Sequence, residues 1–141
     1  MKKLFVLVII SVFAMNVMAQ DSVKKVYLLF EFMQVNDEHS SDYWNVEEFW
    51  SGIHKQRIAD KQITGWDFWS LSPAGTKQGS QYLTVTTFSS LKDMLQPGGF
   101  ENTAATAKKI YPKMTDKEIN EMMNLTNLSR DIANQVYYEQ I

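Results

Sequence analysis

The chain has 141 residues, with 14 Lys and Arg, 16 Asp and Glu, two His and no Cys. Its slightly acidic balance argues against nucleic-acid binding, which needs a basic surface, and the lack of cysteine excludes disulfides and a thiol nucleophile. The length fits one domain that can bury a hydrophobic core.

The first 19 residues have the pattern of a secretory signal peptide. Two lysines precede the almost entirely apolar stretch Leu4–Ala14, and Val17–Ala19 places small residues before a cut between Ala19 and Gln20. The alternative is a transmembrane anchor, but the apolar stretch is shorter than the roughly 20 residues that span a bilayer. We therefore expect an exported protein, periplasmic or secreted, without a membrane association after cleavage. The mature chain, residues 20–141, keeps 12 Lys and Arg against 16 Asp and Glu.

The first element of the mature chain is predicted to be a central strand over Val23–Val35. This stretch is rich in β-branched and aromatic residues, lacks Gly and Pro, and is mostly apolar on both faces. Its one acid, Glu31, would lie against a covering element, where a buried carboxylate needs a partner. A polar loop over Asn36–Asp42 then leads into a helix, with Ser41 or Asn45 as its N-cap.

An apolar stripe runs along this helix at the spacing of about 100° per residue. It is formed by Val46, Phe49, Trp50 and Ile53. Arg57 falls in the middle of the stripe and His54 lies on its flank. A charge on an apolar stripe is costly unless it reaches water or meets an acid. Arg57 could therefore pair with Glu31 or Asp67, or bind the carboxylate of a ligand.

Two further strands should form a hairpin after this helix. Residues 60–64 end the helix, Trp66–Leu71 is an aromatic strand, Ser72–Gln81 is a long connection, and Tyr82–Phe88 alternates again. In the aromatic strand, Trp66 and Phe68 share one face, while Asp67, Trp69 and Leu71 share the other.

The C-terminal part predicts three helices and a last strand, over Leu91–Leu95, Glu101–Ile110, Thr115–Ile132 and Gln135–Ile141. Ser89 or Ser90 can cap the first of these helices, and Thr115 with Glu118 forms a capping box at the head of the third. The order of strand, helix, strand, strand, helices and strand indicates a single α+β domain over residues 20–141, with helices on one face of the sheet.

Three runs of residues are notable together with this order: His54–Ile58 near the end of the long helix, Gly65–Trp69, and the Thr-rich strand Tyr82–Phe88. They resemble the ferredoxin-like dimeric α+β barrel superfamily, which includes antibiotic-biosynthesis-monooxygenase-like and stress-responsive proteins. The resemblance covers most of residues 23–141 without a signature motif. It implies a βαββαβ fold with a four-stranded antiparallel sheet, a dimer of facing sheets, and a cavity for a small organic molecule or haem.

A homodimer would also explain the apolar residues expected on the face of the sheet away from the helices. The sequence pattern assigns to that face Tyr27, Leu29, Met33, Trp69, Leu71, Tyr82 and Phe88. Large exposed apolar patches are rare on monomers. Pairing of two such sheets is therefore the favoured interpretation, and cover by the helical segments at residues 90–110 is the alternative.

The sequence contains no strong catalytic motif. His39 and His54 stand fifteen positions apart without spaced acidic partners, so we expect no metal site and no cofactor. His54 could be a general base, an axial haem ligand or a structural residue, and Arg57 is the other candidate catalytic residue. The candidates for contact with a ligand are Glu31, Trp50, Trp66, Trp69, Tyr82 and Thr84.

Two functions of different classes are consistent with these residues. The first is a small-molecule-binding or stress-related module that shelters an apolar or aromatic ligand. The alternative is an enzyme of the cofactor-independent monooxygenase type that acts on a phenolic or quinol-type substrate, or a haem-binding enzyme.

Overall fold

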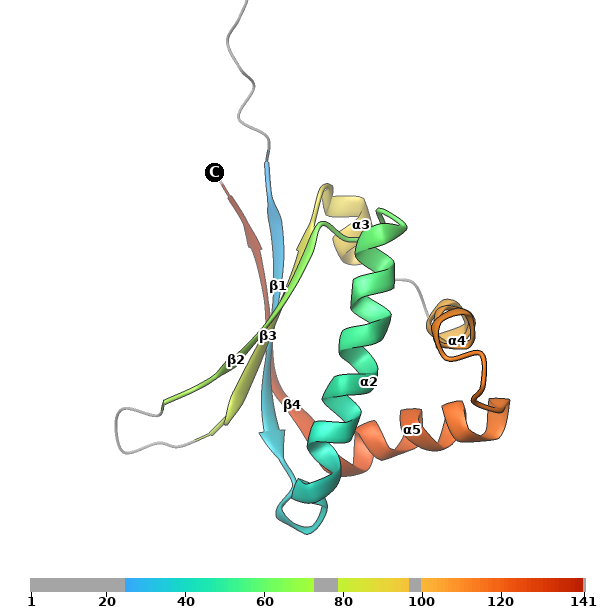
Figure 1. Ribbon diagram of the computed structural model, residues 1–141. Coiled ribbons are helices and arrows are strands. Elements are labelled where there is room, and N and C mark those ends of the chain that lie inside the picture. The colour runs from blue at the N-terminus through green and yellow to red at the C-terminus, as the bar shows by residue number, and fades with distance from the viewer. Residues whose placement is uncertain (1–24, 73–78, 97–99, 141) are drawn as a thin grey trace, which may run out of the picture.

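The computed structural model describes residues 25–72, 79–96 and 100–140 (Figure 1). In chain order its elements are β1 (Tyr27–Val35), the short 3-10 helix η1 (Asp37–His39), α2 (Ser40–Ala59), β2 (Gly65–Ser70), β3 (Tyr82–Phe88), α3 (Leu91–Leu95), α4 (Phe100–Ile110), α5 (Asp116–Ser129) and β4 (Arg130–Glu139). The expected signal peptide and the centre of the hairpin connection lie outside these residues. Among the described helices, none combines the length and the apolar character needed to cross a membrane.

The four strands form one antiparallel sheet in the order β2-β3-β1-β4, with the helices on one side of it (Figure 1). Strands β1 and β3 are central and antiparallel, and α2 and α5 connect strands across the sheet. This order and connectivity are those of the ferredoxin-like fold. The predicted fold class is therefore confirmed.

The prediction of which sheet face is covered was wrong for β1 and β3. Leu29, Met33 and Phe88 are buried, at 6%, 1% and 2% exposure, because their side of the sheet lies under the helices. Tyr82, on the same side, packs on Tyr43 of α2 with ring centroids 5.0 Å apart. Both alternating sets of β1 are apolar, so the hydrophobic pattern alone could not assign the covered face.

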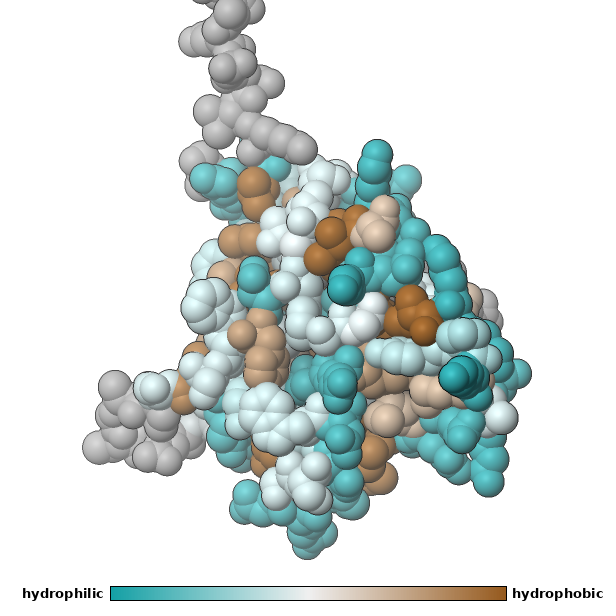
Figure 2. All heavy atoms as spheres, viewed as in Figure 1, coloured by the Kyte–Doolittle hydropathy of each residue, from teal (hydrophilic) through white to brown (hydrophobic). Residues whose placement is uncertain are grey.

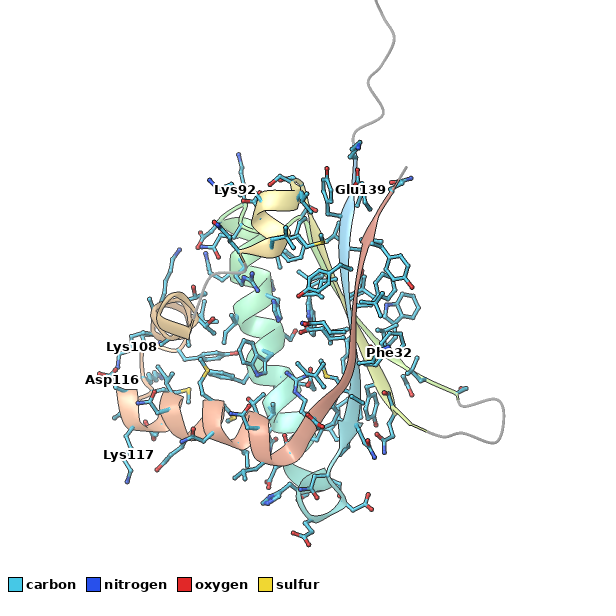
Figure 3. The ribbon with its side chains drawn as sticks, turned by 180° about the vertical axis from the view of Figure 1, so that it is seen from behind. Phe32, Lys92, Lys108, Asp116, Lys117 and Glu139 are labelled. Carbon is cyan, nitrogen blue, oxygen red and sulfur yellow. The ribbon has the colours of Figure 1, made fainter. Side chains whose placement is uncertain are left out.

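The open face of the sheet instead carries the other alternating set of β1 and β3, together with residues of β2 and β4. Figure 3 shows Phe32 on the side of the sheet away from the helices. Phe30 meets Tyr138 of β4 edge to face, with ring centroids 4.9 Å apart. Trp69 lies on this face as expected, at 56% exposure. The apolar residues of the open face are Leu28, Phe30, Phe32, Trp69, Leu83, Val85, Val136 and Tyr138.

Strand β4 begins earlier than predicted and contains a bulge. Helix α5 ends at Ser129, whose carbonyl accepts a hydrogen bond from the Asn36 backbone N–H at 2.9 Å. Ile132, expected at the end of the helix, therefore lies in the strand. Phe32 pairs with Asn134 but Met33 pairs with Ile132, so Ala133 is an extra residue in β4. Because of the bulge, the even-numbered residues before it, Arg130 and Ile132, face the helices, whereas the even-numbered residues after it face the open side.

The helices pack on one another through a core that α2 shares with α4 and α5, formed by Phe49, Ile53, Ala107, Ile119 and Met123. Gly52 allows the close approach of Tyr111, because a Cβ at that position would lie 2.1 Å from the Tyr111 hydroxyl oxygen. An exposed ion pair between Lys108 and Asp116, at 2.8 Å, joins α4 to the start of α5 (Figure 3). Hydrophilic residues cover much of the surface around α4 and α5 (Figure 2).

The predicted helix caps are confirmed at two helices and wrong at a third. Ser90 Oγ accepts a hydrogen bond from Asp93 N at 3.1 Å, and the capping box at Thr115 is present. Ser41 and Asn45, however, lie inside α2, which begins at Ser40. The turn η1 leads directly into α2, and the side chain of Asn36 caps that turn by accepting from Glu38 N.

Candidate functional site

A line of polar and aromatic side chains runs along α2 on the side that faces the sheet and the end of α5. It consists of Tyr43, Glu47, Trp50, His54 and Arg57, which alternate in steps of four and three residues. That spacing places side chains on one face of a helix. The buried side of α2 is therefore rich in ionisable groups, and these groups meet partners from β1, β2 and β4.

His54 lies between two indole rings. Its imidazole stacks on Trp66 of β2, with centroids 4.8 Å apart and planes at 13°, and on Trp50 of α2, at 5.8 Å and 29°. Its Nδ1 lies 3.3 Å from Arg57 Nη1. Because a guanidinium can only donate, Nδ1 must accept, and this contact assigns the imidazole proton to Nε2.

Burial lowers the pKa of His54 to about 3, and the charges of Arg57 and Arg130 act in the same direction. Both effects disfavour the imidazolium, because burial and nearby cations raise the free energy of a positive charge. His54 is therefore a neutral side chain at physiological pH. It holds the guanidinium of Arg57 as a hydrogen-bond acceptor.

Glu31 of β1 is fixed in the sheet by two neutral donors. Its Oε2 accepts a hydrogen bond from Thr84 Oγ1 at 3.2 Å, and its Oε1 accepts from Gln135 Nε2 at 3.0 Å. The amide oxygen of Gln135 in turn accepts from the Tyr137 hydroxyl at 3.2 Å. Each carboxylate oxygen has two lone pairs, so Glu31 keeps acceptor capacity beyond these two bonds.

Arg57 is half-buried, and none of the described acids lies within ion-pair distance of it. Asp67, one of its two expected partners, is exposed on the open face of the sheet. Glu31, the other, acts on it only over a longer distance. Burial lowers the pKa of Arg57, while the charge of Glu31 acts in the opposite direction. The guanidinium is thus partly removed from water, with His54 as its hydrogen-bond partner.

A buried ion pair lies nearer the start of α2. Glu47 Oε1 is 2.8 Å from Arg130 Nη1, and the two side chains are 6% and 11% exposed. The contact is an ion pair without a well-aligned hydrogen bond, since both carboxylate oxygens lack an aligned donor among the described residues. Burial raises the pKa of Glu47, and Arg130 and then Tyr43 oppose that rise. Arg130 also contacts Met33 Sδ.

The structure brings most of the predicted site residues together and separates two of them. The side chains on the helix side of the sheet, around α2, are Glu31, Trp50, His54, Arg57, Trp66 and Thr84. Tyr82 is on the same side but lies with Tyr43 and Phe68, with ring centroids 5.0 and 5.2 Å away. Trp69 is on the open face.

Sequence reasoning missed Glu47, Arg130 and Gln135. Glu47 could have been found, because it is four residues after Tyr43 and seven before His54, on the same helix face. Arg130 and Gln135 could not, because their orientations depend on the bulge in β4. The described residues contain no group of three or more His, Asp or Glu side chains that could hold a metal ion.

Two surface hollows are formed by described residues away from His54 and Arg57. The larger has a volume of about 360 Å³ and lies between α2, α5 and the segment that joins α4 to α5; it is lined by Asn45, Glu48, Phe49, Tyr111, Met114, Met122 and Leu125. The other, of about 280 Å³, lies where β1 and β4 meet the end of α5, and Arg130 lines it.

A scan against protein-family models finds no match, and no curated protein matches the chain. Among solved structures, HapK from Hahella chejuensis aligns over 82% of this chain and 92% of its own, at 11% identity and a TM-score of 0.47. A conserved protein of unknown function from Bacteroides thetaiotaomicron, a possible oxidoreductase, aligns over 84% and 98%, at 8% identity and 0.43. A dimeric protein of unknown function with a ferredoxin-like fold from Bacteroides fragilis aligns over 83% and 95%, at 12% identity and 0.43. Similarities this low assign no function or assembly to the chain.

Proposed function

We propose that this protein is an exported module that binds a small apolar or aromatic molecule between α2 and the sheet. The observation that carries the proposal is the half-buried Arg57, which lacks an ion-pair partner among the described acids and is held by a neutral His54 between two indoles. Burying part of a cation without an acid costs free energy, of which an aromatic ligand recovers a part through cation–π contact and an acidic one recovers more through its charge. Sites of this kind combine aromatic surface with a few fixed polar groups.

The charge state of His54 favours binding over the catalytic roles considered for it. A general base works best when its pKa is near the working pH, and His54 has a pKa of about 3. An axial haem ligand usually donates its second ring N–H to an acceptor, whereas Nδ1 of His54 accepts from Arg57.

Thermal-shift measurements on the mature chain, with a panel of quinones, fatty acids, haem and aromatic acids, test the proposal. At least one aromatic compound should raise the Tm in a saturable way. Trp66→Leu should remove the ligand-induced shift, since Trp66 stacks on His54. The matched variant Trp69→Leu changes the same strand on its other face and should keep it. A panel without any shift would refute the proposal, and a shift lost only in Trp69→Leu would place the ligand on the open face instead.

The alternative function is a cofactor-independent monooxygenase-like enzyme for a phenolic or quinol-type substrate. It is favoured by Glu31, a fixed carboxylate on the same side as Arg57, which would replace His54 as the base. Oxygen consumption with anthrone- or quinol-like substrates distinguishes the two functions. We expect none above the uncatalysed rate. Turnover that Glu31→Gln abolishes would establish the enzyme.

We further propose that the protein is a homodimer whose two open sheet faces pack together. The open face carries apolar residues from all four strands, and a patch of this kind is unusual on a monomer. Sedimentation of the mature chain should give about twice the monomer mass, and Phe32→Glu should give a monomer. Leu128→Glu, which changes a side chain that is 53% exposed on α5, is the control. A monomeric wild-type chain at micromolar concentration would contradict this assembly.

Export is tested separately by expression of the full chain in a bacterium and N-terminal sequencing of the product in the periplasm and medium. A start at Gln20 is expected. An uncleaved chain in the cytoplasm would rule out the export part of the proposal.

A further inference from the structure

We propose that the ligand of this site is a planar aromatic carboxylate with a hydrogen-bond donor next to the carboxylate, a class in which 2-hydroxybenzoate is the simplest probe. Arg57 binds the carboxylate, Glu31 accepts from the neighbouring donor, and His54 is a positioning residue that orients Arg57. This inference rests on the proposed function, because it concerns the same site.

The carboxylate is inferred from Arg57. A guanidinium presents its N–H donors in a planar fork that matches a carboxylate. One of these donors is engaged by His54 Nδ1 at 3.3 Å, and the described part of the chain places no acid within ion-pair distance. An anion is therefore the ligand group that best compensates the partial burial of this side chain, while a neutral ligand would leave it uncompensated.

The hydrogen-bond donor is inferred from Glu31. Its carboxylate lies on the helix-covered side of the sheet, where Thr84 of β3 pairs with both Glu31 of β1 and Phe68 of β2, two residues after Trp66. A ligand carboxylate at Arg57 would be repelled by Glu31 unless a donor stood between the two negative groups. Thr84 and Gln135 hold Glu31 in place but do not use all its lone pairs. A hydroxyl beside the ligand carboxylate supplies the missing donor when it turns from its own carboxylate to Glu31, while Arg57 donates to the carboxylate in its place.

The planar ring is inferred from the aromatic side chains around the polar groups. Trp66 stacks on His54, and Phe68 continues the row, with its ring centroid 6.3 Å from that of Trp66 and its plane at 24°. Phe68 then stacks on Tyr82 at 5.2 Å and 19°. These rings already stack on one another, so a ligand ring meets the row at its ring edges, where an aromatic partner gains edge-to-face as well as apolar contact.

Isothermal titration of the mature chain with 2-hydroxybenzoate, benzoate and 2-hydroxybenzamide tests these assignments. The amide keeps the ring and the hydroxyl but lacks the charge, and benzoate lacks the hydroxyl. We expect the hydroxy acid to bind at least tenfold more tightly than either. Arg57→Gln should weaken binding of the acid by roughly ten- to a hundredfold and remove its advantage over the amide. Lys55→Gln, which removes the same charge from the exposed side of α2, should bind like the wild type.

Two more variants examine the other roles. Glu31→Gln should remove the advantage of 2-hydroxybenzoate over benzoate. His54→Phe keeps a flat ring between the indoles but lacks the Nδ1 acceptor. It should weaken the binding of 2-hydroxybenzoate severalfold while the midpoint of urea unfolding stays unchanged. His54→Gln restores an acceptor and should recover part of the lost affinity. Because His54 stays neutral, affinity should be constant between pH 6 and 8.

The results of these titrations distinguish a failure of the inferred ligand class from a failure of the proposed binding function. Equal affinities for the acid and the amide, or an Arg57→Gln variant that keeps the preference for the acid, would overturn the inference. If neutral aromatic compounds bind at the Trp66 site and the acids do not, the inference fails and the proposed function stands. If no compound of either panel binds, both fail.

Discussion

The buried ion pair between Glu47 and Arg130 provides a quantitative test of the electrostatics under α2. We consider the variant Arg130→Met, which keeps much of the apolar side chain and removes the charge. Glu47 would then be a carboxylate on a side chain that is 6% exposed, without a cation in contact. Removal of one partner from a buried ion pair typically costs about 3–5 kcal/mol, because the remaining charge is uncompensated.

The structure limits this cost and makes it depend on pH. Glu47 can take up a proton instead of remaining charged. For a carboxyl with an ordinary pKa of 4.5, protonation costs about 3.4 kcal/mol at pH 7 and about 0.7 kcal/mol at pH 5. Folding already raises the pKa of Glu47, so the stability linked to its protonated form is present at low pH and is lost as the pH rises. The penalty of Arg130→Met should therefore shrink by up to about 2.7 kcal/mol between pH 7 and pH 5.

Urea unfolding followed by tryptophan fluorescence, at pH 5 and pH 7, measures this penalty. The double variant Glu47→Gln with Arg130→Met removes both charges, and its stability relative to the wild type should vary much less with pH. At pH 7 the double variant should be more stable than Arg130→Met alone. A penalty for Arg130→Met that is equal at both pH values, or a double variant as unstable as the single one at pH 7, would refute the reasoning.

Three further predictions concern other contacts. NMR of the imidazole Cε1–H should show that His54 does not titrate between pH 5 and 8, and a midpoint near 6.5 would contradict its burial. Gly52→Ala should lower the free energy of unfolding by about 1–3 kcal/mol, because the new Cβ meets the Tyr111 hydroxyl. Gly65→Ala, whose new Cβ has its nearest contact at 3.4 Å, should lower it less. A larger loss of stability in Gly65→Ala than in Gly52→Ala would contradict this packing. Thr115→Ala should cost about 1 kcal/mol in the same assay through loss of the capping box, and an unchanged midpoint would show that the cap contributes little.

Local features were predictable from the sequence because they depend on neighbouring residues. The capping box at Thr115 needs only Glu118, and the alternation of Trp66 to Trp69 needs only the pleat of one strand. The order of the elements then fixes the fold class, because few topologies connect them without crossings. Arg57 was identified in the same way, from its position on a helix stripe.

Which face of the sheet the helices cover was not predictable from hydrophobicity, because polar residues can be covered when they have hydrogen-bond partners and apolar residues can lie on the open face. In β3 the helices cover Thr84 and Thr86, while the more apolar Leu83 and Val85 lie on the open face. A covered threonine is acceptable when its hydroxyl has a partner, and Thr84 donates to Glu31. Hydrophobicity alone favours the opposite assignment. Glu47 itself could be placed on the buried helix face from its spacing, but its partner Arg130 could not be identified, because it is far away in the sequence.

The extra residue Ala133 has a consequence for tolerance to deletion. Phe32 pairs with Asn134 and Met33 with Ile132, so removal of Ala133 would make Ile132 and Asn134 neighbours in a regular strand and leave both on their present faces. Arg130 would still pair with Val35 on the helix side, where it meets Glu47. A second residue inserted beside Ala133 would instead reverse the phase of the start of β4, and Arg130 would then enter the apolar surface on which the dimer is proposed to depend. This position should therefore tolerate the loss of one residue better than the gain of one.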